Sequence, residues 1–143
     1  MRRGQPMLIT QKNQYAIRAV YELARRRNQG PIKGAEIAAV QKIPPRFLEV
    51  IMVQLKRGGI VAAKRGHKGG YRLTKSPDNI SVGDILRRME KLESFHCVSC
   101  IVKNDCDLKG DCAFLPMWAK AHNAMLDVFD NTTIQNLIDE DVH

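Results

Sequence analysis

The chain has 143 residues, of which 44% are hydrophobic and 27% are charged, and its net charge is +8. This length fits one domain, or one domain with a modest appendage, and the composition excludes a disordered or fibrous protein. No apolar stretch approaches the ~18 residues that a membrane-spanning helix needs, and no N-terminal segment resembles a signal peptide. We therefore expect a cytoplasmic protein without a membrane partner.

The charge is divided unevenly along the sequence. Residues 1–75 carry 17 Lys and Arg against three acidic residues, a net charge of +14, whereas residues 76–143 carry six against twelve, a net charge of −6. This asymmetry predicts that the first half of the chain meets a polyanion. Double-stranded DNA is favoured over a membrane surface, because the basic residues are not gathered on one amphipathic helix with an apolar opposite face.

Three helices are predicted in the first half, over residues 11–27, 34–41 and 45–57, because apolar residues recur there at helical spacing. The third helix has a proline in its first turn and two glycines after its end, which are typical start and stop signals. Two short helices that are joined by a tight turn and preceded by another helix indicate a helix-turn-helix.

The third of these helices has two distinct faces when its residues are placed at 100° intervals. One face is apolar and is expected in the core: Leu48, Ile51, Met52 and Leu55. The opposite face presents charges around two small aliphatic side chains: Arg46, Glu49, Val50, Val53 and Arg57. The valines suit contact with thymine methyl groups, which favours a recognition helix over a face that is merely solvated.

Residues 60–73 predict a β-hairpin with a basic tip. Two strand-like stretches enclose residues 64–70, in which three glycines provide the backbone freedom of a turn. The tip carries the cations Arg65 and Lys68 together with His67. A basic hairpin after a recognition-type helix is typical of a wing, whose tip meets phosphates or the minor groove.

Three more helices are predicted beyond the hairpin. Ser81-x-x-Asp84 resembles a capping box, a long helix spans residues 113–130, and Thr132-x-x-Gln135 begins a last short helix. The long helix has an apolar stripe with few partners in its own chain: Trp118, Ala121, Met125, Val128 and Phe129. We expect this stripe to pack on a second copy, which would place two recognition helices about one DNA turn apart over a palindromic site. Burial within the monomer is the alternative.

The predicted fold class is mainly α with a small β-hairpin wing: a winged helix-turn-helix followed by a long C-terminal dimerisation helix. Residues 1–6 are a flexible N-terminal extension, residues 7–80 the DNA-binding domain, and residues 81–143 the cysteine loop and the dimerisation helices.

All four cysteines lie within sixteen residues: Cys97, Cys100, Cys106 and Cys112. In the cytoplasm such thiols are metal ligands or redox groups rather than disulfides. A zinc site of four cysteines is irregular here, because only the first pair has the two-residue spacing of a zinc knuckle. The five-residue spacings leave enough chain for a larger object, and both 2Fe–2S and 4Fe–4S clusters remain open.

Four motifs carry a resemblance to a known family: Tyr15-Ala16-Ile17-Arg18, Ile43-Pro44-Pro45-Arg46-Phe47-Leu48-Glu49, Gly66-x-x-Gly69-Gly70-Tyr71 and Cys100-x5-Cys106-x5-Cys112. Together they resemble the Rrf2 family of bacterial transcriptional regulators, over nearly the whole chain from about Met7. The resemblance implies a homodimeric winged helix and an iron–sulfur cluster on Cys100, Cys106 and Cys112 with one non-cysteine ligand. It also implies that Glu49 reads a base.

The fourth ligands of two branches of this family are absent from the sequence. The histidine of the iron–sulfur-biogenesis regulator corresponds to Leu115, and the aspartate of the nitric-oxide sensor corresponds to Gln14. Cys97 or His96 could replace them.

We therefore predict a DNA-binding transcriptional regulator, and specifically a repressor, whose operator binding is controlled by an iron–sulfur cluster sensing redox state, nitric oxide or iron–sulfur status. The residues assigned to the major groove are Arg46, Glu49, Val50 and Val53. Those assigned to phosphates or the minor groove are Lys12, Arg57, Arg65, His67 and Lys68. The alternative is a zinc-stabilised or metal-free DNA-binding regulator without cluster sensing. An enzyme is not expected, because no catalytic constellation or hydrolase motif is present.

Overall fold

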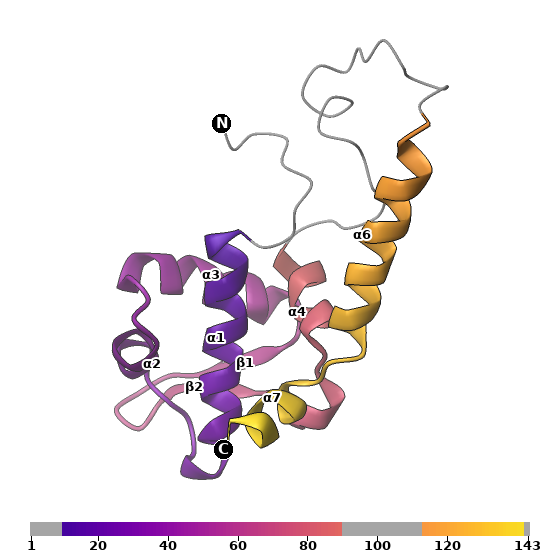
Figure 1. Ribbon diagram of the computed structural model, residues 1–143. Coiled ribbons are helices and arrows are strands. Elements are labelled where there is room, and N and C mark those ends of the chain that lie inside the picture. Colours follow the sequence, from indigo (N-terminus) through magenta and orange to yellow (C-terminus); the bar gives the residue numbers. More distant parts are fainter. Residues whose placement is uncertain (1–9, 90–112, 142–143) are drawn as a thin grey trace.

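Figure 1 shows the computed structural model of the chain, which describes residues 10–89 and 113–141. The helices are α1 (Gln11–Arg25), α2 (Gly34–Gln41), α3 (Pro45–Arg57), α4 (Val82–Met89), α6 (Leu115–Asp130) and α7 (Ile134–Glu140). Short 3-10 turns lie at Arg27–Gln29 and Pro77–Asn79, and strands β1 (Val61–Lys64) and β2 (Gly70–Leu73) pair in an antiparallel hairpin. No helix in these two ranges is long and apolar enough to cross a membrane.

The winged helix-turn-helix predicted from the sequence is confirmed. Helices α2 and α3 have the predicted bounds, α1 is two residues shorter than predicted, and the hairpin follows α3 directly. The predicted helix 113–130 begins at Leu115 instead, with its proline still in the first turn. The predicted division at residue 80 remains a prediction, and both α4 and α7 pack against α1.

Side-chain caps fix where two of the C-terminal helices begin. At the start of α4, the Ser81 hydroxyl accepts from the Asp84 amide and the Asp84 carboxylate accepts from the Ser81 amide, both at 3.0 Å, so the predicted capping box is confirmed. The cap of α7 was predicted one residue too early. Thr133 caps the helix with Asn136, because the Thr132 hydroxyl instead donates to the carbonyl of Val128 in the last turn of α6.

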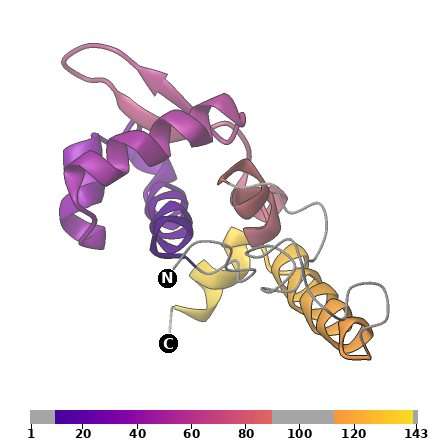
Figure 2. The ribbon, with the colours of Figure 1, turned by 90° about the horizontal axis from the view of Figure 1, so that it is seen from above.

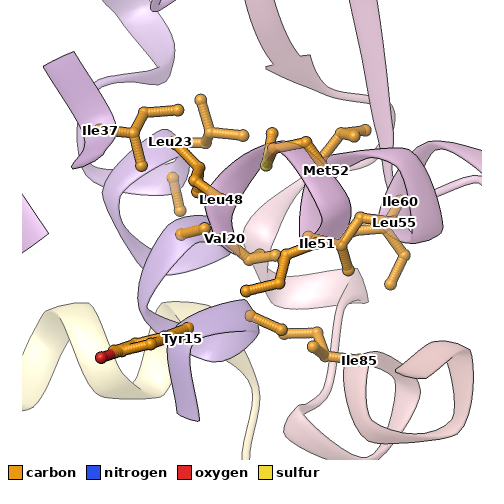
Figure 3. Packing of buried hydrophobic residues seen from close by; sticks show 14 of the residues in the cluster. Tyr15, Val20, Leu23, Ile37, Leu48, Ile51, Met52, Leu55, Ile60 and Ile85 are labelled. Carbon is orange, nitrogen blue, oxygen red and sulfur yellow. The ribbon is translucent and has the colours of Figure 1, made fainter. Parts of the chain in front are cut away.

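The core forms around α1, which packs against α2, α3, α4 and α7. Figure 3 shows side chains from several helices gathered in one cluster, among them Val20, Ile37, Ile51 and Ile85. The four apolar residues predicted for the inner face of α3 are all buried. Each fully buried aliphatic side chain of this kind contributes roughly 1.5–3 kcal/mol to folding. Burial of this face therefore keeps the opposite face of α3 exposed to solvent.

Helix α6 lies at the edge of the molecule, and in Figures 1 and 2 it is on the opposite side from the wing. It packs against α4, and an ion pair joins Arg87 of α4 to Asp130 at its end. Trp118 and Val128 of the predicted stripe are 46% and 62% exposed. Burial of the whole stripe within the described part of the monomer is therefore wrong.

Candidate nucleic-acid interface

The outer face of α3 carries the side chains that are predicted to contact DNA, and all five are exposed: Arg46, Glu49, Val50, Val53 and Arg57. Val50 and Val53 are 56% and 48% exposed. Aliphatic surface in water is unfavourable by about 25 cal/mol per Å², and a partner with apolar groups removes this cost. Thymine methyl groups in the major groove are such partners, and the surrounding charges can address phosphates and base edges.

Phe47 in the first turn of α3 was not assigned a role from the sequence. It is half exposed, and its ring meets the buried ring of Tyr15 edge-on, with the two centroids 6.0 Å apart. The guanidinium carbon of Arg18 lies 5.2 Å from the Tyr15 ring centroid on the same helix. A single aromatic residue in an amphipathic helix normally belongs to the core, so only the structure reveals that Phe47 extends the exposed face.

A buried carboxylate fixes α2 against α1. Glu22 is 1% exposed, and its Oε1 accepts a 2.9 Å hydrogen bond from Gln41 at the end of α2. Arg25 and Arg26 lie 3.5 and 3.8 Å from the same carboxylate, and Arg26 also bonds Glu36 of α2. Because a buried charge must be paired, this network favours one orientation of the two helices.

The turn between α2 and α3 requires an unusual backbone conformation. Lys42 has φ 57° and ψ 45°, the left-handed region, and it is the one residue other than glycine with positive φ in the described ranges. This conformation lets the Ile43 amide donate to the Ala38 carbonyl at 2.9 Å and closes the end of α2. The helix-turn-helix angle is therefore set by a tight, hydrogen-bonded turn.

The wing is attached to the body of the protein by backbone hydrogen bonds. The Ile32 amide donates to the Tyr71 carbonyl at 2.9 Å, and the Tyr71 amide donates to the Ile32 carbonyl at 2.8 Å. The neighbouring Gly70 has φ +146°, and a Cβ there would lie 2.5 Å from the Ile32 carbonyl oxygen. Only glycine permits this approach. The tip residues of the wing are exposed: Arg65, His67 and Lys68.

Side chains hold the junction between α3 and the wing from two directions. The Gly58 carbonyl accepts a 2.8 Å hydrogen bond from Arg88 Nε of α4. The Thr74 hydroxyl, just past β2, donates to the carbonyls of Gly59 and Ile60. Figure 2 shows α3 and the hairpin on the same side of the molecule. The junction therefore fixes the relative orientation of the two candidate DNA-contacting elements.

The remaining predicted positions are more dispersed. Lys12 lies in the first turn of α1 and is partly buried, Gln14 is exposed in the same turn, and Leu115 is the exposed first residue of α6. The predicted ligands Cys97, Cys100, Cys106 and Cys112, together with His96, lie outside the described residues. Within residues 10–89 and 113–141, no group of three or more His, Cys, Asp or Glu side chains is arranged to hold a metal ion. The donor set itself, four thiols within sixteen residues, chemically suits soft iron or zinc.

Comparison with known proteins adds independent information about this winged helix. Residues 9–140 match the model of the Rrf2 family, described as iron-dependent transcriptional regulators. The chain is 36% identical over 132 residues to the slr0846 protein of Synechocystis sp., which covers 92% of this chain and 87% of that protein.

Two solved structures share the fold over most of their length. IscR from T. potens has a TM-score of 0.74 at 27% identity, with 92% of this chain and 86% of that chain covered. CymR, the global cysteine regulator of B. subtilis, has a TM-score of 0.73 at 29% identity, with 90% and 94% covered.

Proposed function

Because the chain belongs to the Rrf2 family of DNA-binding transcriptional regulators, which are not enzymes, we propose that it is a homodimeric cytoplasmic repressor controlled by an iron–sulfur cluster. The observation that carries the proposal is the exposed face of α3, where two valines lie among charged side chains and a basic wing follows. The four clustered cysteines support the sensing part of the proposal.

The outer face of α3 enters the major groove in this proposal. Glu49 accepts a hydrogen bond from cytosine N4, Arg46 contacts a neighbouring base or phosphate, and Val50 and Val53 contact thymine methyl groups. The contacts to phosphates and the minor groove come from Lys12, Arg57, Arg65, His67 and Lys68. Support comes from the exposure of the outer-face side chains of α3 and of the wing tip, and from the charge of +14 on residues 1–75.

The dimer forms through α6. Its exposed apolar side chains include Met117, Trp118 and Val128, on a helix that lies at the edge of the molecule. A second copy packed on this stripe would bury it around a two-fold axis. Since the wing lies on the opposite side from α6, the two recognition helices would face outward and meet successive turns of a palindromic operator.

The cluster is bound by Cys100, Cys106 and Cys112 in this proposal, with Cys97 or His96 as the fourth ligand. A bound cluster would supply redox chemistry, and its iron would react with nitric oxide. The segment that carries these ligands connects α4, which packs on α3, to α6. A change in this segment therefore has a physical route to the spacing of the two recognition helices. The family description as iron-dependent regulators and the similarity to IscR support iron, and a zinc-stabilised or metal-free regulator without cluster sensing is the alternative.

The decisive experiment is spectroscopic. Anaerobically purified protein should be coloured, should show the absorbance and electron-resonance signals of an iron–sulfur cluster, and should contain iron and sulfide in stoichiometric amounts per chain. Colourless protein that takes up no iron during reconstitution would reject the cluster, and zinc found by metal analysis would favour the alternative.

The coupling to DNA needs a second measurement. Affinities of the cluster-loaded and the cluster-free protein for the same duplex at fixed salt should differ, and equal affinities would reject control by the cluster. A Cys100→Ser, Cys106→Ser, Cys112→Ser variant provides the matched cluster-free control.

A further inference from the structure

Two consecutive arginines in the last turn of α4 reach different parts of the molecule. Arg87 forms an ion pair with Asp130 at the end of α6, with Nη2 and Oδ2 2.9 Å apart. Arg88 donates from Nε to the carbonyl of Gly58, the residue that follows α3, at 2.8 Å. One turn of α4 thus contacts both the long helix and the end of the helix that carries the exposed valines.

The contact between Arg88 and Gly58 depends on both residues. A Cβ at position 58 would lie 2.5 Å from Arg88 Cδ and 2.6 Å from Cγ, which is closer than non-bonded carbon atoms approach in proteins. The backbone does not demand glycine here, because Gly58 has φ −78° and ψ −3°, where any L-residue is comfortable. The missing side chain at position 58 therefore makes room for the arginine stem.

The contact between Arg88 and Gly58 lies where the chain leaves α3 and enters the wing. The carbonyls of Gly58, Gly59 and Ile60 all accept hydrogen bonds from side chains, the first from Arg88 and the other two from Thr74. Thr74 connects the junction to its own hairpin, whereas Arg88 connects it to α4. A cation at the C-terminal end of α3 also interacts favourably with the helix dipole.

We propose that Arg88 is a positioning residue for DNA recognition, which fixes the junction of α3 and the wing relative to α4 and, through the adjacent Arg87, relative to α6. The inference rests on the proposed function in one respect, that α3 reads DNA. It adds a specific route from the last described turn of α4 to the DNA-contacting elements, because Met89, one residue after Arg88, is the last described residue before the cysteines in the sequence. A displacement of the last turn of α4 moves the Gly58 carbonyl and the start of the wing with it.

Two variants break the contact from opposite sides. Arg88→Met keeps most of the stem that packs on Gly58 and removes the guanidinium, whereas Gly58→Ala keeps the charge and displaces the guanidinium. Lys120→Met is the matched control, because it removes one positive charge from an exposed position on α6, away from the apolar stripe. The probes are a duplex selected by the wild-type protein from a random-sequence pool and a random-sequence duplex of the same length.

Each single variant should bind the selected duplex about fivefold more weakly, as expected for loss of one charge-assisted hydrogen bond at a partly exposed site. Binding to the random-sequence duplex should change by less than about twofold, because phosphate contacts dominate there. The double variant should lose no more than either single variant, since both remove the same contact. Lys120→Met should leave the ratio of the two affinities unchanged.

Unchanged affinity for the selected duplex, or equal losses on both duplexes, would overturn the inference, as would additive losses in the double variant. Thermal unfolding identifies a variant that does not fold. If Arg88→Met does not fold, Arg88→Lys replaces it, because lysine keeps the charge but has a shorter reach to the Gly58 carbonyl. The expected loss of selectivity is the same. Glu49→Ala separates the two proposals. If Glu49→Ala changes base preference while the Arg88 variants keep the wild-type selectivity for the selected duplex, only the inference about Arg88 fails. If Glu49→Ala has no effect, the proposed reading face itself is wrong.

Discussion

The Tyr21 hydroxyl donates a 2.6 Å hydrogen bond to the carboxylate of Asp141 and joins the first helix to the residue that follows the last one. Burial, and after it the hydrogen bond to Asp141, together raise the pKa of Tyr21 to about 12. Helix α7 also packs against α1, and the Ile134 amide donates to the Ile80 carbonyl at 2.9 Å. The C-terminal part of the chain is thereby attached to the helix-turn-helix.

Tyrosine ionisation should test this attachment. The pKa of Tyr21 is raised above its ordinary value of 10.0, so the folded state binds this proton more tightly than the unfolded state does. Its contribution to stability is complete below about pH 10 and is lost as the pH rises toward about 12. In an ultraviolet titration, Asp141→Asn should lower the pKa of Tyr21 part of the way, because burial, the larger cause, remains.

Tyr21→Phe is the control, and it should remove the transition near pH 12 that belongs to Tyr21. A Tyr21 transition at the ordinary value of 10.0 would contradict the hydrogen bond.

The Arg87–Asp130 ion pair should make part of the stability depend on acid pH. The hydrogen bond from Arg87 lowers the pKa of Asp130 below its ordinary value of 3.8. Its contribution is therefore present above that value and is lost as the pH falls through the lowered pKa. Because both side chains are 39% exposed, Asp130→Asn should reduce the free energy of unfolding at neutral pH by no more than about 1 kcal/mol.

Chemical denaturation of both proteins across the acid range measures this effect. The difference in the free energy of unfolding between wild type and Asp130→Asn should shrink toward zero below the lowered pKa. The neighbouring Asp127→Asn is the control, and it should not show this loss of an ion pair. A pH-independent difference would point to packing instead of charge.

Two substitutions should distinguish a residue that reads a base from a residue that contacts phosphate. Glu49→Ala should relax the preference at one position per half-site by roughly 1–3 kcal/mol, because a carboxylate that accepts from cytosine N4 discriminates against other bases. Lys68→Ala should weaken binding to all duplexes alike and reduce the salt dependence by about one released ion. Binding measured against a library of single-base variants at several salt concentrations tests both, and a uniform loss in both variants would move the reading face elsewhere.

Association through α6 should be sensitive to charge on its apolar face. Trp118→Glu places a carboxylate in the proposed dimer interface, so sedimentation should show a monomer. The helical content of this monomer should be unchanged. Asn123→Glu introduces the same side chain on another face of the helix and should leave the dimer intact. A dimer that survives Trp118→Glu would place the interface on another surface.

Periodicity and helix punctuation were sufficient to predict α3, because it has a proline in its first turn, glycines after its end and one apolar face. The approximate bounds predicted for α2 also agree with the structure. The cap of α7 was missed because adjacent threonines compete for it, and the choice depends on which hydroxyl closes α6. Glu22 gave no signal in the sequence, since an acidic residue in a helix normally faces water. Its burial becomes favourable only when Gln41 and two arginines surround it.

The candidate site was predictable where it depends on a single helix and not where it depends on contacts between segments. Exposure of Val50 and Val53 follows from the helical angle alone, and the structure agrees. The approach of Arg88 to Gly58 joins positions thirty residues apart, and the two glycines after α3 indicated only a helix end. The four cysteines lie outside the described residues, so their predicted role in binding a cluster stays a prediction.

The paired hydrogen bonds between Ile32 and Tyr71 have a consequence for motion within the protein. They make the segment before α2 a third, short partner of the hairpin, so the wing cannot swing like a hinged flap without breaking both of them. Bending at the base of the hairpin is therefore energetically unfavourable. The wing and the helix-turn-helix should rotate together as one rigid unit. Any allosteric input would then change how the whole unit is tilted on the duplex, and the shape of its binding surface would stay constant.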